Sequence, residues 1–372
     1  AHVWIVYYLI KYIIKNYNFK RRLFLISKIS ILSALGTGIQ LLFLGSLMPL
    51  VIIFFSVLFF SKKLRSTEII LDFSIYIIFF YFVLILFWVD THSNILVLPF
   101  SYFIETLSLK VGWPYNLVGG EYTFSSDVSS MYLLINYLYK LPEFIIFLYF
   151  ITFPILIYKH KRLKGLFKNF NIKIMLIIIL LAYPNLILIF INYSIYDGIR
   201  LFLWAVPYLT IIPAITVYCI LNEKKIIFSL AKIVLIFLFI FHLFNFIKIT
   251  PYHYTFLNYL SGDVEKRYKK FENDYWSTSL KELILSSNLS NKKISYTVCG
   301  VNPAVAKIYM SQKYKNVEYT DVSQASYIIM TNRTLYSDEN QSISNCFDKY
   351  DYKNVAEVKR NGLILSAIKK LK

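Results

Sequence analysis

The stretch IIFSLAKIVLIFLFIFHLFNFIK, residues 226–248, decides the class of this chain. It is 23 residues long and almost entirely apolar. At about 1.5 Å per residue, a helix of this length crosses the roughly 30 Å hydrocarbon core of a bilayer. Basic residues precede it in NEKK (222–225), and a polar region begins at residue 249. The pattern predicts a membrane-spanning helix whose first end faces the cytoplasm.

Similar apolar runs recur along the chain. Of its 372 residues, 57% are hydrophobic and only 16% are charged, against about a quarter charged in soluble domains. The run 23–60 is divided at SALGTG (33–38), because basic residues flank both of its ends and so place both on one side. We predict an α-helical polytopic membrane protein with a partial first span at 1–14 and seven complete spans, at 23–38, 41–60, 69–89, 142–158, 172–193, 200–221 and 226–248.

The formal net charge of +19 is compatible with nucleic acid or with an anionic membrane as a partner. The basic residues cluster in short loops such as 158–173, and this distribution favours membrane lipids and no nucleic acid. The stretch 90–130 holds four acidic residues against one Lys and is expected outside. We therefore expect a transmembrane domain over 1–248 and a periplasmic (extracytoplasmic) α/β domain over 249–372, in a multi-pass protein of the inner membrane.

The outer loop 90–141 is too long for a simple connector. We expect a short interfacial helix where apolar residues recur at helical spacing, at Ile95, Leu98, Tyr102 and Glu105. A turn-rich stretch follows over 112–127, and a second short helix over 129–144 is expected to end near Pro142. A structured loop of this kind can cover a site at the membrane surface.

The polar tail alternates helical and strand patterns, which predicts a small α/β domain. Ser279 and Glu282 have the spacing of a capping box at the start of a helix. Strands are expected over 293–300, 325–332 and 362–371, and a helix over 302–310.

Three cysteines are present. Cys219 lies in a predicted membrane helix, whereas Cys299 and Cys346 lie in the tail. Two unpaired buried thiols are the simpler expectation, and a disulfide is permitted if the tail is extracytoplasmic. The chain begins inside an apolar run without Met, so we also expect that it lacks an N-terminal portion.

The patterns of common soluble catalysts are absent from the sequence. Its five histidines are scattered without metal-ligand spacing, and no Walker or Rossmann glycine pattern occurs. No cofactor is identified, and a divalent metal has no visible ligands. The remaining residues that could carry out chemistry lie on the predicted outer face.

The segment YDGIR (196–200) opens the span 200–221 with an acid and a base. Asp197 can cap the first helical turn, and Arg200 can pair with Asp197 or present a bidentate fork to a phosphate. An interfacial cap with a snorkelling arginine is the structural alternative.

Five more charged or aromatic positions share this face. Lys140 is either a headgroup-level cation or a phosphate ligand, and Glu121 and Asp127 are either solvated or in contact with a substrate. Asp274 and Trp276 stand where the tail begins. They are either interfacial anchors or contacts to a headgroup or sugar.

Four stretches, in order, resemble one family: GEYTFSSDVSSMYLLINYLYKLP, YDGIRLFLWAVPYLTIIPA, PYHYTFLNYLSGDVEKRYKKFENDYWSTSLKE and ASYIIMTN. They look like the later two-thirds of bacterial GT-C glycosyltransferases, the family-39-like group of protein mannosyltransferases and lipid A aminoarabinose transferases. The resemblance implies transfer of a sugar from a polyprenyl-phosphate donor to an extracytoplasmic lipid, glycan or protein. It also implies an inverting reaction whose carboxylate base lies in a loop before residue 1, so the catalytic residue itself is unknown.

The resemblance carries over residue by residue. Tyr196, Asp197 and Arg200 match its YDG-x-R pattern, although Leu201 stands where a His commonly follows. Tyr132 and Pro142 match a YLP…TP segment with Leu134 in place of the first proline, and Ser277 replaces the glycine of DYWG. The resemblance thus implies that Arg200, Asp197, Tyr196 and Lys140 bind the donor phosphate, with acceptor or sugar contacts from Glu121, Asp127, Tyr132, Asp274 and Trp276.

Two other functions fit the same membrane pattern. A transporter or flippase of lipid-linked sugars usually shows inverted repeats, and none is detected in this sequence. A non-catalytic envelope protein is the third reading, consistent with Leu201. An acidic residue in an upstream outer loop would favour the transferase.

Overall fold

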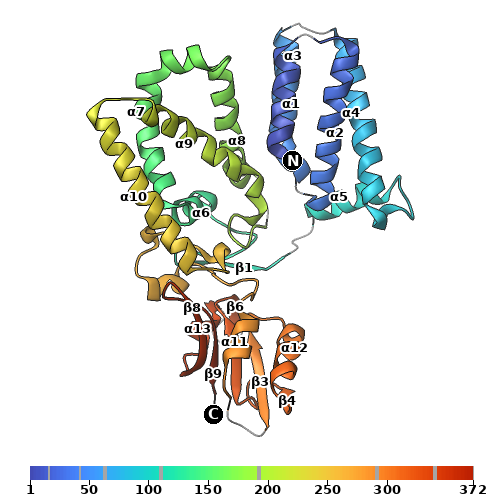
Figure 1. Ribbon diagram of the computed structural model, residues 1–372. Coiled ribbons are helices and arrows are strands. Elements are labelled where there is room, and N and C mark those ends of the chain that lie inside the picture. Colours follow the sequence, from blue (N-terminus) through green and yellow to red (C-terminus); the bar gives the residue numbers. More distant parts are fainter. Residues whose placement is uncertain are drawn as a thin grey trace. The chain divides into compact units, whose positions relative to one another are not determined.

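The computed structural model describes residues 1–15, 17–41, 43–61, 65–108, 112–190, 194–289, 293–337 and 342–371 (Figure 1). The chain forms two compact units. Unit 1 comprises Ala1–Val111, Ile172–Pro184 and Leu201–Leu209, and unit 2 comprises Gly112–Asn171, Asn185–Arg200 and Thr210–Lys372. The site discussed below lies within unit 2.

Within these described ranges, six helices are long and apolar enough to cross a bilayer. They make the chain a multi-pass membrane protein, as its composition predicts. The six are α2 (Phe19–Ile39), α4 (Ser66–Phe87), α7 (Glu143–Leu166), α8 (Phe170–Phe190), the 3-10 turn Arg200–Ala205 continued by α9 (Val206–Leu221), and α10 (Ile226–Lys248). Residues 191–193 of the predicted span 172–193 lie outside the described residues.

Two predicted spans are shorter apolar helices. The partial first one is α1 (His2–Ile14), and the span expected at 41–60 is α3 (Phe43–Ser61), whose side chains are described only as far as Ser56. The predicted break between 23–38 and 41–60 is confirmed, but it falls at Gln40 and Leu41 rather than at the glycines. A Cβ on Gly36 would collide with the Phe43 ring, so this glycine lets the next helix fold back closely.

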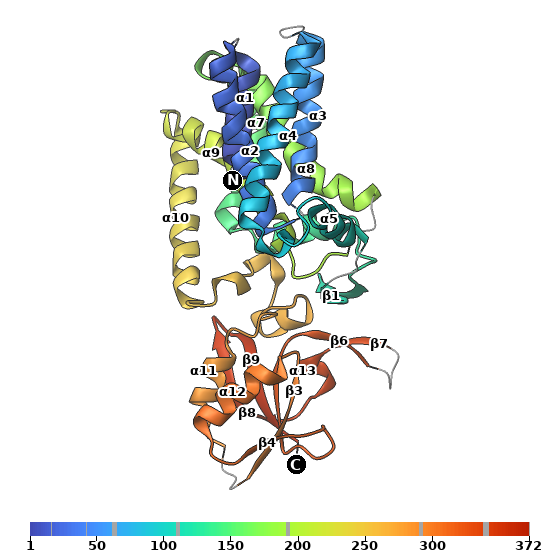
Figure 2. The ribbon, with the colours of Figure 1, turned by 90° about the vertical axis from the view of Figure 1, so that its right-hand side faces the viewer.

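In unit 1, helices α1, α2, α3 and α4 run side by side (Figures 1 and 2). Leu25 and Ile26 of α2 are buried with Tyr12 of α1. Outward-facing apolar residues such as Ile70 and Phe82 remain exposed, as expected for helices whose solvent is lipid. The predicted interfacial helix is present as α5 (Leu98–Ser108).

In unit 2, the turn-rich stretch is a β-hairpin, which the sequence analysis did not predict. Strands β1 (Tyr115–Val118) and β2 (Glu121–Phe124) pair around Gly119 and Gly120. Both glycines have positive φ, the conformation that a two-residue hairpin turn requires. The predicted second short helix follows as α6 (Tyr132–Lys140), and Pro142 stands at the N-cap of α7.

The C-terminal domain has a five-stranded mixed sheet in the order β4-β3-β5-β9-β8. Strand β3 (Ile294–Cys299) is parallel to β4 (Val317–Tyr319) and β5 (Tyr327–Thr331), while β9 (Leu363–Lys370) is antiparallel to β5 and β8 (Asn354–Arg360). The three predicted strands are confirmed, and they are the adjacent central ones. The two edge strands were missed because they are mostly exposed and mix apolar with charged residues, so neither forms an apolar run.

Helices cover both faces of this sheet. Helices α11 (Leu280–Ser286) and α12 (Pro303–Lys313) share one apolar core with it, and α13 (Cys346–Lys349) packs in the other. Cys299 and Cys346 form a disulfide in this second core, so the expectation of two unpaired thiols is wrong. A further hairpin, β6 (Thr334–Ser337) and β7 (Ser342–Asn345), extends at the end of the sheet (Figure 2).

Candidate functional site

The YDGIR segment holds its acid in a strained, buried turn. Asp197 has φ of 59° and Gly198 has φ of 67°, and the Asp197 side chain is only 5% exposed. Its Oδ2 accepts a hydrogen bond from Arg200 Nη1 at 3.0 Å, so the expected pairing is present. Its Oδ1 accepts from Arg333 Nη1 at 2.7 Å. The carboxylate therefore joins two guanidinium groups instead of capping the helix that follows, which corrects the expected cap.

Arg333 is the main residue that sequence reasoning missed. It lies between β5 and β6, one residue beyond the ASYIIMTN stretch, and its side chain is 8% exposed. Its guanidinium lies 4.4 Å from the centroid of the Trp113 ring, and a nitrogen lies 3.7 Å from Glu272 Oε2. A basic residue directly after a fully buried strand was the available signal, because such a charge needs a partner.

Arg200 is the more accessible of the two arginines. Its side chain is 38% exposed, and its guanidinium stacks 4.4 Å from the centroid of Trp276, itself an exposed ring. Pairing with Asp197 on one edge and stacking on Trp276 orient the planar group. The remaining N–H donors can meet an anionic ligand in a bidentate arrangement.

Tyr132 ties the YDGIR turn to the outer loop. It is buried on α6, and its hydroxyl accepts a hydrogen bond from the Gly198 backbone N–H at 2.9 Å. Asn116 of β1 donates to the Ile195 carbonyl at 2.6 Å. Tyr132 therefore positions the turn; the contact with a sugar that the resemblance implies for it stays a prediction.

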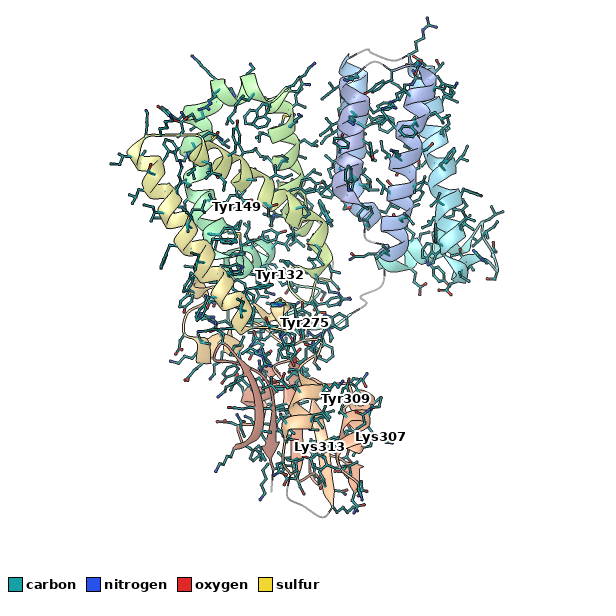
Figure 3. The ribbon with its side chains drawn as sticks, in the orientation of Figure 1. Tyr132, Tyr149, Tyr275, Lys307, Tyr309 and Lys313 are labelled. Atoms are coloured by element: carbon teal, nitrogen blue, oxygen red, sulfur yellow. A yellow bond between two sulfur atoms is a disulfide. The ribbon has the colours of Figure 1, made fainter. Side chains whose placement is uncertain are left out.

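A small cavity lies beside this turn, with an empty volume of about 220 Å³. Figure 3 marks Tyr132 and Tyr275, two of its aromatic residues. Its polar lining side chains come from β1, α6, the YDGIR turn and the segment after α10, and they are Asn116, Tyr132, Asn136, Lys140, Asp197, Glu272 and Tyr275. The Oδ1 of Asn136 is buried without a hydrogen-bond partner in the described structure, so the cavity has an acceptor to offer.

Lys140 reaches into this cavity from the end of α6. The positive φ of Gly198 favours glycine, and a Cβ on it would displace the Lys140 Nζ from its present position. Burial lowers the pKa of Lys140 to about 8, although Glu272 and Asp197 act in the opposite direction. Among the described residues, its ammonium makes no ion pair. It lies 6.0 Å from the centroid of the Phe271 ring. An ammonium held by an aromatic ring and by no carboxylate is suited to an anionic ligand.

Glu272 closes the other side of the cavity. Its Oε1 accepts hydrogen bonds from the Thr334 backbone N–H at 2.8 Å and from the Thr334 hydroxyl at 2.7 Å. Burial raises the pKa of Glu272, and Arg333 counteracts that rise. Three cations, Lys140, Arg200 and Arg333, thus share the site with two carboxylates, which leaves one excess positive charge when all are ionised.

Asp274 has a structural role, which corrects its expected contact with a substrate. It is fully buried, and its carboxylate accepts hydrogen bonds from the backbone N–H groups of Thr278 at 2.8 Å and Ser279 at 3.0 Å. The Ser279 hydroxyl also donates to Asp274, and Glu282 pairs with Arg360 at 2.6 Å. The predicted capping box is therefore wrong, because Asp274 caps this turn from outside the helix.

The backbone conformation at Ser277 shows why the resembled DYWG element has a glycine at this position. Its φ is 54°, in the left-handed region where glycine fits without steric cost. A glycine, as in the resembled DYWG element, adopts this φ without steric cost. Ser277 adopts the same conformation and keeps Trp276 beside Arg200.

The other predicted residues lie away from the cavity lining. Glu121 and Asp127 are exposed, and Tyr196 is half-buried, with its ring against Gly112. In the described parts of the chain, no group of three or more His, Cys, Asp or Glu side chains is placed to hold a metal ion.

Comparisons with family models, curated proteins and solved structures find no match. The geometry of unit 2 and the motif resemblance are therefore the basis for a functional proposal.

Proposed function

We propose that this protein is an integral-membrane glycosyltransferase of the GT-C type that takes its sugar from a polyprenyl-phosphate donor. The acceptor is an extracytoplasmic lipid, glycan or protein. The observation that carries the proposal is Arg200, which is accessible, oriented by Asp197 and Trp276, and adjacent to the cavity that holds Lys140.

This arrangement suits a phosphate leaving group. Breaking the bond between sugar and phosphate leaves negative charge on the phosphate oxygens, and prepositioned cations stabilise that charge best where water is excluded. Arg200 supplies a planar fork, and Lys140 supplies a compact charge within the cavity. Asp197 is the partner of two arginines, so it serves in positioning and not as the base.

Three features support an extracytoplasmic site in the inner membrane. The basic loops predict which helix ends face the cytoplasm, and YDGIR lies at an opposite end. The stretch 90–130, which precedes α6, holds four acidic residues against one Lys. The disulfide between Cys299 and Cys346 is of the kind that persists in an oxidising compartment.

The test is transfer by the full-length protein in a deletion strain. Cells complemented with the native gene, Arg200→Ala or the surface control Lys281→Ala are compared by mass spectrometry of envelope glycans and lipids. We expect the native protein and Lys281→Ala to restore one sugar modification, and Arg200→Ala to reduce it at least 100-fold at equal membrane abundance. Native-level modification by Arg200→Ala would contradict the proposal. Translocation of a lipid-linked sugar without transfer would favour the flippase.

A further inference from the structure

We propose that unit 1 contains a second binding site, separate from glycosyl transfer, for an amphiphile that places an apolar chain and an ammonium head in it. The site is a cavity between α1, α2, α3 and α4 with an empty volume of about 590 Å³. Its single charged lining residue within the described structure is Asp72.

The apolar part of the cavity suits a hydrocarbon chain. Its walls are aliphatic and aromatic side chains from all four helices, including Ile5, Leu9, Ile26, Ile29, Leu50 and Phe54. Along α1 the lining runs from Ile5 to Tyr12, seven residues or about 10 Å of helix. An extended chain can therefore lie along the helices with its head at Asp72.

Asp72 is held in place but not fully satisfied. It is 2% exposed, and its Oδ2 lies 2.9 Å from Arg22 Nε and accepts a hydrogen bond from the Tyr12 hydroxyl. Its Oδ1 is buried without a hydrogen-bond partner in the described structure. Leaving a buried acceptor without a hydrogen bond is unfavourable, and more so when the group is charged. A ligand that donates a hydrogen bond to Oδ1 removes that cost.

The surrounding charges favour a cationic donor. Arg22 divides its guanidinium between Asp72 and Glu68, to which Nη1 donates at 2.7 Å. Exposed Arg65 donates its backbone N–H to Glu68 and lies outside the cavity lining. An ammonium has three donors and no acceptor, so it complements the free carboxylate oxygen. An anionic head would meet that oxygen with like charge.

The depth of Asp72 agrees with a lipid-derived head. It lies six residues after Ser66, the first residue of α4, which is about 9 Å along the helix. That distance places it near the boundary between headgroups and hydrocarbon, where the amine of a phospholipid or of a single-chain amphiphile resides. The two sources share the same chemistry and are separated by experiment.

Binding is measured on the intact purified protein with matched probes. The single-chain probes are dodecylamine, dodecanol and dodecanoate, followed by native mass spectrometry and thermal shift. The lipid probes are phosphatidylethanolamine and phosphatidylglycerol in nanodiscs. We expect dodecylamine to bind at least tenfold more tightly than dodecanoate, and retention of phosphatidylethanolamine over phosphatidylglycerol if the native source is a phospholipid.

Three variants decide the assignment. Asp72→Asn should lose at least tenfold in dodecylamine affinity, and Ser33→Leu, which fills the cavity, should weaken all single-chain probes while leaving the charges intact. Asp90→Asn, which changes an exposed acid in the same unit, should leave binding of all the probes unchanged.

Equal binding of the three dodecyl probes by the native protein would overturn the proposal, as would unchanged amine binding by both Asp72→Asn and Ser33→Leu. Arg200→Ala should retain amine binding, so this result does not depend on the proposed transfer.

Discussion

Asp197 in unit 2 and Asp72 in unit 1 are both buried carboxylates, but their surroundings differ. Asp197 uses both oxygens, one for Arg200 and one for Arg333. Asp72 uses only one oxygen, for Arg22 and Tyr12, and leaves the other empty. The first site has more cations than acids, whereas the second offers an unsatisfied acceptor. Under the two proposals, the same residue type therefore serves an anion-binding site in one unit and a cation-binding site in the other.

The largest expected effect comes from removing the charge at these two positions. Asp197→Asn leaves Arg333 buried with only Glu272 nearby, and breaking a buried pair costs about 3–5 kcal/mol. Asp72→Asn should cost less, about 1–3 kcal/mol, because Arg22 keeps Glu68. Equilibrium unfolding in SDS measures both. A larger loss of unfolding free energy for Asp72→Asn than for Asp197→Asn would contradict this comparison.

The glycine beside Asp197 provides the next test. Gly198→Ala forces a side chain into a left-handed conformation, at about 1–2 kcal/mol, and displaces the Lys140 ammonium. We expect sugar transfer to fall at least tenfold. Gly45→Ala in α3 is the matched control, since its Cβ would meet nothing within 4 Å and alanine favours a helix. Unchanged transfer by Gly198→Ala would show that Lys140 does not need this contact.

Lys140 should make donor binding depend on pH. Its pKa of about 8 means that the ammonium loses its proton as pH rises through 8, so affinity for a phosphate-bearing donor should fall between pH 7 and pH 9. Folding stability should move the other way, rising between about pH 8 and 10.5, because the unfolded chain binds more protons there. Lys140→Met should flatten both profiles. A native profile as flat as that of Lys140→Met would remove Lys140 from the site.

The smallest effect is expected at the turn that carries Trp276. Ser277→Gly relieves the left-handed strain but adds freedom to the unfolded chain, so a gain of about 1 kcal/mol or less is expected. The unfolding midpoint measures it, with Thr278→Gly as the control. A loss of stability in Ser277→Gly would mean that the Ser277 hydroxyl, which donates to the Gly300 carbonyl at 3.3 Å, matters more than the backbone conformation.

The membrane helices and the central strands were predictable from sequence because their signals are local. An apolar run of about 20 residues predicts a span wherever it occurs, and β3, β5 and β9 are buried enough to read as apolar runs. The capping box failed because its serine has a competing partner in Asp274, which local spacing cannot reveal.

The features of the candidate site also divide into those that the sequence predicts and those that only the tertiary structure reveals. The sequence by itself determined that Asp197 and Arg200 stand together, since they are three positions apart on one turn. Only the tertiary structure decided that Arg333 shares Asp197 across 136 positions, that Glu272 and Lys140 line one cavity, and that Cys299 pairs with Cys346. Such partners are chosen by packing between distant segments, and the buried charges then require each other because water cannot solvate them.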